Sequence, residues 1–238
     1  MKWALVIAVM LAGCNTDLDE PWELAHDRII AVRANPPRIL PGEQATLELL
    51  LGFEEQPVTQ RAPDFAAVVS PQSLKDTVKP DAGQWVVTAP TEDQLAAARV
   101  ELELEPGAPV PLQIGVGVTW PYPVMSVDGM TFGATKTVWL GETATNPALS
   151  GMLINNADAP EGAEIVVPKD EKVPLFVEAD DTIYIVNWLT SCGEMHDFDL
   201  HSAYLVVTPE SKQEGELAVV YRDDKGGVTW RVWQIRAE

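Results

Sequence analysis

Hydrophobic residues alternate with polar ones along much of this chain, in short runs that proline and glycine interrupt. The first two alternating runs after Asp27 are Ile30, Val32 and Ala34, and then Ala45, Leu47, Leu49 and Leu51. Asn35-Pro36-Pro37 and Pro41-Gly42 separate them. A period of two places every second side chain on one face of a strand, so the pattern predicts strands with one buried face.

The same pattern continues to the end of the chain. Further strands are expected at residues 66–69, 84–88, 110–120, 131–140, 151–154, 172–177, 182–189, 203–207, 217–222 and 228–235. One segment differs: residues 91–99 contain three consecutive alanines behind Thr91, which can cap the first turn of a short helix. Residues 223–227 read as a hairpin turn, because glycine adopts positive φ at low steric cost. The fold class expected is all-β.

The sequence turns polar between Gly141 and Pro147, and the strand pattern then repeats. We therefore expect two tandem β-sandwich domains, residues 26–142 and 147–238. Trp188 falls in the third run of the second domain, where immunoglobulin-like domains often bury a tryptophan. Residues 14–25 show neither the helical nor the strand period of hydrophobic residues and are interpreted as a short tether.

The N-terminus has the pattern of a secretion signal. Lys2 precedes an apolar run over residues 3–11, which is far shorter than the roughly 20 residues that span a bilayer. Leu11-Ala12-Gly13-Cys14 resembles the lipobox of bacterial lipoproteins. The resemblance implies cleavage after Gly13 and a lipid on Cys14, which makes the membrane a partner. Asn15 in place of aspartate favours the outer membrane over the inner membrane by the same resemblance.

Composition narrows the classes of partner. With 36 acidic and 16 basic residues the formal charge is −20, and such a surface repels the phosphate backbones of nucleic acids. Of the two cysteines, Cys14 is assigned to lipid, so Cys192 remains alone and no internal disulfide is expected. Packing must therefore stabilise the fold.

Several segments together resemble an uncharacterised lipoprotein family of myxobacteria and related deltaproteobacteria. They are residues 28–37 with Pro41-Gly42-Glu43, residues 136–140 with Asn146-Pro147, residues 188–191, and the closing hairpin 219–233. The resemblance implies two tandem immunoglobulin-like domains, a lipid anchor and no established activity.

The segment 192–201 holds the strongest candidates for chemistry. Cys192, Met195, His196 and His201 are the ligand types of a blue-copper site, which also forms on a β-sandwich. Met195 precedes His196, however, whereas the family order is Cys, His, Met, and the upstream histidine available is His26 in the other domain. A copper or zinc site at Cys192, His196 and His201 is therefore the alternative, and an ordinary polar loop is preferred. A Cys192 and His196 pair acting as nucleophile and base lacks an orienting group.

Other candidates are weaker. Asp180-Asp181 and Asp223-Asp224 lack the alternating spacing of a calcium loop and fit turn chemistry. Residues 120–125 are rich in aromatic residues and proline, and would suit sugar or protein docking if exposed. Nucleophile elbows, zinc-protease motifs and phosphate loops are absent from the sequence. We therefore expect a non-enzymatic envelope lipoprotein, without a cofactor, that has a binding, adhesion or structural role towards an envelope protein or glycan.

Overall fold

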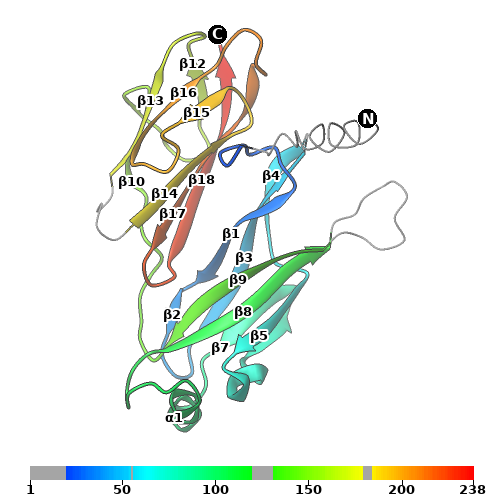
Figure 1. Ribbon diagram of the computed structural model, residues 1–238, viewed down its shortest axis with the longest axis vertical. Helices are drawn as coiled ribbons and strands as arrows, with labels where there is room; N and C mark the ends of the chain where they lie inside the picture. The colour runs from blue at the N-terminus through cyan, green and yellow to red at the C-terminus, as the bar shows by residue number, and fades with distance from the viewer. Residues whose placement is uncertain (1–19, 55, 120–130, 179–183) are drawn as a thin grey trace, which may run out of the picture.

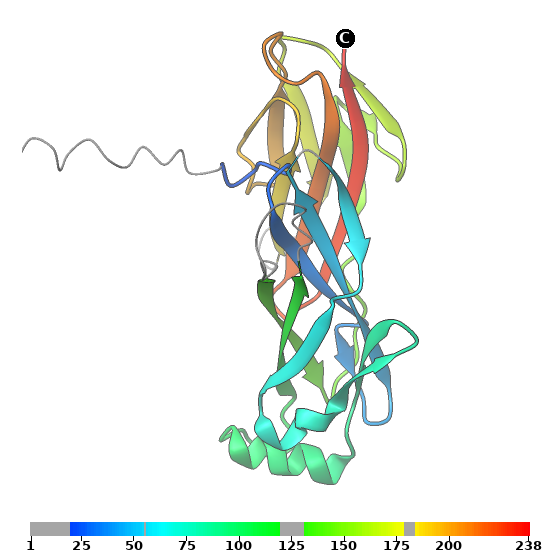
Figure 2. The same ribbon diagram turned by 90° about the vertical axis from the view of Figure 1, so that its right-hand side faces the viewer.

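The computed structural model describes residues 20–54, 56–119, 131–178 and 184–238, and these form an elongated molecule built from strands (Figures 1 and 2). The elements are β1 (Arg28–Asn35), β2 (Arg38–Ile39), β3 (Gln44–Phe53), β4 (Gln56–Arg61), β5 (Phe65–Ser70), η1 (Gln72–Thr77), β6 (Val78–Asp81), β7 (Gln84–Thr88), α1 (Glu92–Glu101), β8 (Val110–Thr119), β9 (Thr131–Leu140), β10 (Ser150–Ile154), β11 (Ala157–Asp158), β12 (Glu164–Val167), β13 (Val173–Glu178), β14 (Tyr184–Thr190), β15 (Glu194–His196), β16 (Ser202–Val206), β17 (Glu214–Asp223) and β18 (Val228–Ala237).

Each half of the chain forms a sandwich of two sheets. In the first, β1-β3-β7-β6, with β4 added beside β3, faces β2-β9-β8-β5. In the second, β11-β10-β13-β16-β15 faces β12-β18-β17-β14.

The two sandwiches share one strand order. In each, a short strand pairs parallel with the last strand, as β2 does with β9 and β12 with β18. The three strands β5, β8 and β9 correspond in order to β14, β17 and β18. In the facing sheets, the order β1-β3-β7-β6 corresponds to β10-β13-β16-β15, with β4 and β11 as added strands. Four such strands on one sheet, and three plus a short parallel strand on the other, form the arrangement of immunoglobulin-like domains. The all-β, tandem immunoglobulin-like fold expected from the sequence is confirmed.

Separate apolar cores fill the two sandwiches. Ala45, Leu47, Leu49 and Leu51 all point into the first core and are at most 1% exposed, as their alternation predicts. The second core surrounds Trp188 and Trp233, both at most 1% exposed. Trp188 lies on β14 and its Nε1 donates to Leu200 O at 3.0 Å, which pairs the buried indole nitrogen.

The one α-helix among the described residues, α1, lies where the sequence places it, across the end of the first sandwich between β7 and β8 (Figure 1). Its first turn is held by a capping box, in which Thr91 N donates to Gln94 Oε1 at 3.0 Å. Within the described ranges, no helix has the length and apolar character needed to cross a membrane.

Short strands are the elements that the sequence pattern did not reveal. They are β2, β4, β6, β11, β12 and β15, of two to six residues each. Such segments contain too few positions for a period of two to emerge, and β4 and β6 also contain proline. The long strands agree with expectation to within a few residues, and the hairpin turn at residues 223–227 joins β17 to β18.

Candidate functional site

The two sandwiches meet over a third apolar cluster, which is the centre of the domain junction. On β17 and β18, residues alternate between the core of the second sandwich and its outer face. The outer set that enters the junction is Ala218, Val220, Val228 and Trp230, all at most 6% exposed. The outer face of this sheet is therefore covered.

The first sandwich supplies the cover from β1 and β3. Ala31 of β1 and Leu50 of β3 point away from their own core and into the junction, at 4% and 0% exposure. Leu50 lies between Leu49 and Leu51, so β3 is buried on both faces at this point. Figure 1 shows β1, β3 and β4 running beside β17 and β18, so the two sandwiches overlap along their sides.

Part of the expected tether also joins this interface. Glu23 forms a parallel bridge with Thr190 of β14, and Leu24 N donates to Thr190 O at 2.8 Å. Leu24 is 1% exposed within the junction, and Trp22 packs against the second core. Residues 22–24, which lie in the expected short tether, thus pack on the second sandwich, where two large apolar side chains gain burial.

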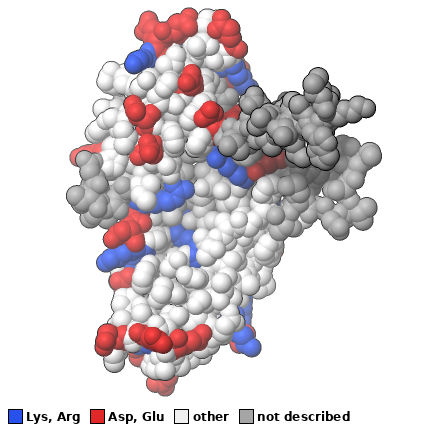
Figure 3. Space-filling view, viewed as in Figure 1, with Lys and Arg blue, Asp and Glu red and all other residues white. Residues whose placement is uncertain are grey.

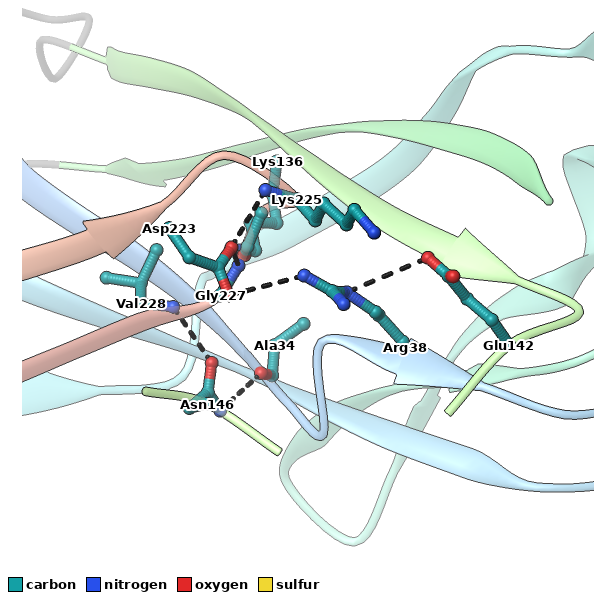
Figure 4. Close-up of polar contacts among 10 residues, drawn as sticks. Ala34, Arg38, Lys136, Glu142, Asn146, Asp223, Lys225, Gly227 and Val228 are labelled. Atoms are coloured by element: carbon teal, nitrogen blue, oxygen red, sulfur yellow. Dashed lines mark hydrogen bonds and ion pairs between the residues drawn. The ribbon is translucent and has the colours of Figure 1, made fainter. Parts of the chain in front are cut away.

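Asp223 is the centre of the polar contacts at the junction (Figure 4). Its Oδ1 accepts from Lys225 N at 2.9 Å and from Gly227 N at 2.6 Å, which fixes the turn between β17 and β18. Its Oδ2 accepts from the Arg38 guanidinium of the first sandwich at 3.3 Å. Arg38 also lies 3.7 Å from Glu142 Oε1. One carboxylate therefore shapes the hairpin and ties it to the other domain.

Asn146, in the segment between the domains, bonds to both of them. Its Nδ2 donates to Ala34 O of β1 at 2.9 Å, and its Oδ1 accepts from Val228 N of β18 at 2.9 Å. Both partners are backbone groups, so this amide satisfies one main-chain acceptor and one main-chain donor at the junction.

Lys136 is the buried cation of the junction. It lies on β9, is 5% exposed, and donates from Nζ to Gly226 O in the turn between β17 and β18. Burial lowers the pKa of Lys136 from 10.5 to about 8; the charge of Asp223 opposes this shift and that of Arg222 adds to it. Removal from water disfavours the charged amine.

Arg222 and Glu216 complete the contacts across the junction. Arg222 donates to Ile30 O of β1 at 3.0 Å and to Asn187 Oδ1 at 2.5 Å, and burial lowers its pKa. Glu216 accepts from Val58 N of β4 at 2.7 Å and from Gln234 at 2.8 Å. The polar contacts therefore lie on several sides of the apolar cluster.

A groove of about 680 Å³ opens beside these contacts, and it is the largest of the described cavities. Its lining includes Arg38, Asn146, Asp223 and Lys225, which already contact one another or neighbouring backbone groups. The lining contains neither cysteine nor histidine. This chemistry suits holding two domains together.

The structure separates the metal ligands proposed from the sequence. Cys192 is 2% exposed in the second core, where burial raises the pKa of its thiol from 9.0 to about 11, against a small opposing effect of Lys212. His196 on β15 stacks on Tyr204 at 4.5 Å and lies 3.5 Å from Glu194 Oε1. Among the described residues, which include Cys192, His196 and His201, no three metal-ligating side chains come together.

Of the remaining candidates, three lie outside the described residues: Cys14, Asp180-Asp181 and the segment 120–125. Asp223 has the turn role that its sequence suggested and, in addition, the link to Arg38 that the sequence did not indicate. One signal for the junction was present: residues 217–221 of β17 are all apolar, which is typical of a strand buried on both faces.

Comparisons with known proteins give only distant likenesses. No protein-family model matches the chain, and no curated protein matches it. Among solved structures, a nucleoside hydrolase-related hypothetical protein from Saccharophagus degradans is 12% identical with a TM-score of 0.31, over 40% of this chain and 26% of that one. The N-terminal Ig1-2 module of the Drosophila receptor protein tyrosine phosphatase DLAR is 10% identical with a TM-score of 0.31, over 90% of this chain and 100% of that one.

The tandem immunoglobulin repeats of Dlar match in the same way, at 10% identity and a TM-score of 0.31, over 87% of this chain and 97% of that one. Values this low carry no information about function. The class of protein follows from the strand order: the chain consists of two tandem immunoglobulin-like sandwiches joined side by side.

Proposed function

We propose that this chain is a lipid-anchored protein of the cell envelope in which the two sandwiches act as one rigid, non-enzymatic binding module. The observation that carries the proposal is the domain junction, where an apolar cluster lies among contacts of Asp223, Lys136 and Asn146. Domains in one chain move relative to each other unless their interface is large and hydrophobic. This interface is apolar at its centre, so the module is expected to hold one shape.

A rigid pair of sandwiches is suited to presenting a surface at a fixed position. The sheet β5-β8-β9 of the first sandwich has an outer face that the second sandwich leaves open apart from the end near Trp139, which the turn at Gly226 approaches, and it offers such a surface. An envelope protein or a glycan is the expected class of partner, since the acidic surface disfavours nucleic acid. The polar groove at the junction supports a structural role better than a catalytic one.

The anchor rests on the sequence Leu11-Ala12-Gly13-Cys14, and the outer membrane is proposed because Asn15 follows Cys14. A single acyl chain binds membranes only marginally, whereas two or three chains, at about 0.8 kcal/mol per buried methylene, give stable anchoring. The short contact of residues 22–24 with β14 supports a fixed point at which the anchored segment meets the folded module.

The anchor is tested with Cys14→Ser in the full chain. Serine offers no thiol for lipid transfer, so the variant is expected to lose labelled palmitate and to keep residues 1–13, while the wild type incorporates label and is shortened. Thr16→Ser is the matched control, because it places a serine two positions further on and keeps the thiol; it should label like the wild type. A Cys14→Ser variant processed to the wild-type size would contradict the anchor.

The binding role is tested separately from the anchor. The full chain, purified in detergent, is expected to turn over no substrate in a broad hydrolase screen. Turnover that disappears with a point substitution in the groove, such as Asp223→Ala, would overturn the non-enzymatic assignment even if Cys14 is lipidated.

A further inference from the structure

Exposed sheet edges invite pairing with another strand, and most edges in this molecule are protected. Among the described edge strands, β2, β11 and β15 have only two or three residues. β4 and β6 each contain a proline and a charged residue, and β12 has four residues and begins with Glu164. The edge of β14 is occupied at Thr190 by Glu23, and β1 lies in the domain junction.

β5 lacks these protections. It is an edge strand of six residues, Phe-Ala-Ala-Val-Val-Ser, with neither charge nor proline. Its regular pairing with β8 ends at a register shift between Val68 and Ser70, where Gln72 Nε2 donates to Val69 O at 2.7 Å. The open edge therefore runs from Phe65 to Val68, and alternate backbone groups there face outward.

The outer face beside this edge is smooth and uncharged. Phe65 and Val69, 42% and 51% exposed, lie over Gly117 and Gly115 of β8: a Cβ at Gly117 would stand 2.1 Å from Phe65 Cζ, and one at Gly115 3.3 Å from Val69 Cγ2. The remaining outward positions of β8 and β9 are also uncharged and include Gln113, Pro111, Gly133, Thr135, Thr137 and Trp139. In Figure 3 this side of the first sandwich is a broad area without charged atoms.

The sequence of β5 complements itself. In an antiparallel pair, directly opposed residues lie on the same face, so a two-fold axis through Ala67 places Ala67 opposite itself. The same register sets Ala66 of one copy opposite Val68 of the other within the open edge. It also brings Phe65 of one copy beside Val69 of the other, just past the register shift, and an aromatic residue beside a β-branched one is a favourable cross-strand pair. The residue on the axis is small, so the two strands can approach without a clash.

Charge also favours contact between copies at this place. A chain with a formal charge of −20 repels its own copies over most of its surface. Near β5 the closest carboxylate, Asp64, is paired with Arg61 at 2.5 Å. β5 itself carries no charge, so two copies that meet along β5 bring no unpaired charges together there.

From these observations we propose that β5 pairs antiparallel with β5 of a second copy of this chain, which joins two four-stranded sheets into one continuous sheet. The pairing does not require the lipid anchor. The corresponding strand of the second sandwich, β14, is bridged at its end by Glu23 of the same chain.

The test is disulfide trapping in the full chain in membranes. At the axis, opposed Cα atoms lie about 4.5–5.5 Å apart, within the range of about 4.4–6.8 Å that a disulfide needs. Ala67→Cys is expected to form a covalent dimer of twice the chain mass under mild oxidation. Thr135→Cys, exposed on the same outer face two strands away, is the matched control and should stay monomeric.

A second substitution makes the result specific. Val69→Lys in the Ala67→Cys chain places a charge beside Phe65 of the other copy and should abolish the covalent dimer. Sedimentation of the wild-type chain in detergent should show dimers that Val69→Lys converts to monomers. Equal cross-linking of Ala67→Cys and Thr135→Cys, or a product with a different protein in place of a second copy, overturns the proposal.

Discussion

The two sandwiches have the same strand order but treat the same face in opposite ways. In the second, the outer face of β14-β17-β18 holds Val220 and Trp230, which the first sandwich covers. In the first, the corresponding face of β5-β8-β9 holds Gly115 and Thr135 and remains open. The same fold thus occurs twice in the chain. The side chains on the outer face of one sheet decide whether that face packs against the other sandwich or stays exposed.

The difference also shows what the junction depends on. The covered face is apolar at its centre and is surrounded by charged and amide contacts from β1, β4 and β9. Arg33 lies 4.1 Å above the ring of Trp230 and also pairs with Glu48. The open face lacks such a combination of apolar centre and polar contacts. The same kind of substitution should therefore change the free energy of unfolding by different amounts on the two faces.

The largest contrast is expected between Trp230→Ala and Thr135→Ala, both on the outer face of the last strand of a sandwich. Trp230 is 5% exposed, and truncating a buried tryptophan costs about 3–5 kcal/mol of unfolding free energy. Thr135→Ala should change it by less than about 0.5 kcal/mol, as is usual on the surface. Urea denaturation of both variants measures the contrast. Equal losses would mean that the two faces are equally buried.

The next effect comes from Lys136 and appears as pH dependence. Its folded pKa of about 8 lies below the ordinary 10.5, so between these values the unfolded chain binds more protons and stability rises with pH. At about 1.4 kcal/mol per pKa unit, the rise is about 3 kcal/mol.

Lys136→Met removes this rise, so the measured quantity is the wild-type stability minus that of the variant at pH 7.5 and 10.5. The difference is needed because Cys192 acts in the opposite sense: its folded pKa of about 11 lies above 9.0, so its contribution to stability falls over that range. A difference that does not change with pH would show that folding does not lower the pKa of Lys136.

A smaller loss is expected at the turn between β17 and β18. Asp223→Ala leaves Arg38 and two backbone N–H groups without their acceptor, which should cost about 1–3 kcal/mol. Asp224→Ala is the matched control, because Asp224 is the exposed neighbour in the same turn. Thermal unfolding compares the two variants. Similar melting temperatures would contradict the claim that the contacts of Asp223 stabilise the junction.

The smallest effect concerns the second core. The Cys192 thiol is 2% exposed and its pKa is raised, so a thiol reagent should label it only after unfolding, whereas Thr135→Cys on the open face should label at once. Cys192→Ala should leave copper and zinc binding after dialysis unchanged. A stoichiometric metal that disappears with this substitution would restore the metal site proposed from the sequence.

The sequence alone could predict the elements but not the contacts between the sandwiches. Leu47, Leu49 and Leu51 revealed their buried face through the period of two, and the capping of α1 was readable from Thr91. Leu50 and Val220 could not be assigned a partner, because each lies opposite residues from the other domain. The metal site kept as an alternative at residues 192–201 could not be decided from the sequence for a related reason: proximity in sequence gave no sign that Cys192 points into the core while His196 lies on β15.

If Cys14 carries the proposed lipid, the docking of residues 22–24 on β14 would decide how the molecule lies at a bilayer. The folded part begins on the side of the rod, between its two ends (Figures 1 and 2). With a lipid on Cys14, the six residues to Glu20 reach at most about 20 Å when fully extended. The rod would then lie beside the membrane with its flank towards the headgroups, and the far ends of both sandwiches would be free to swing as a pair about a single pivot.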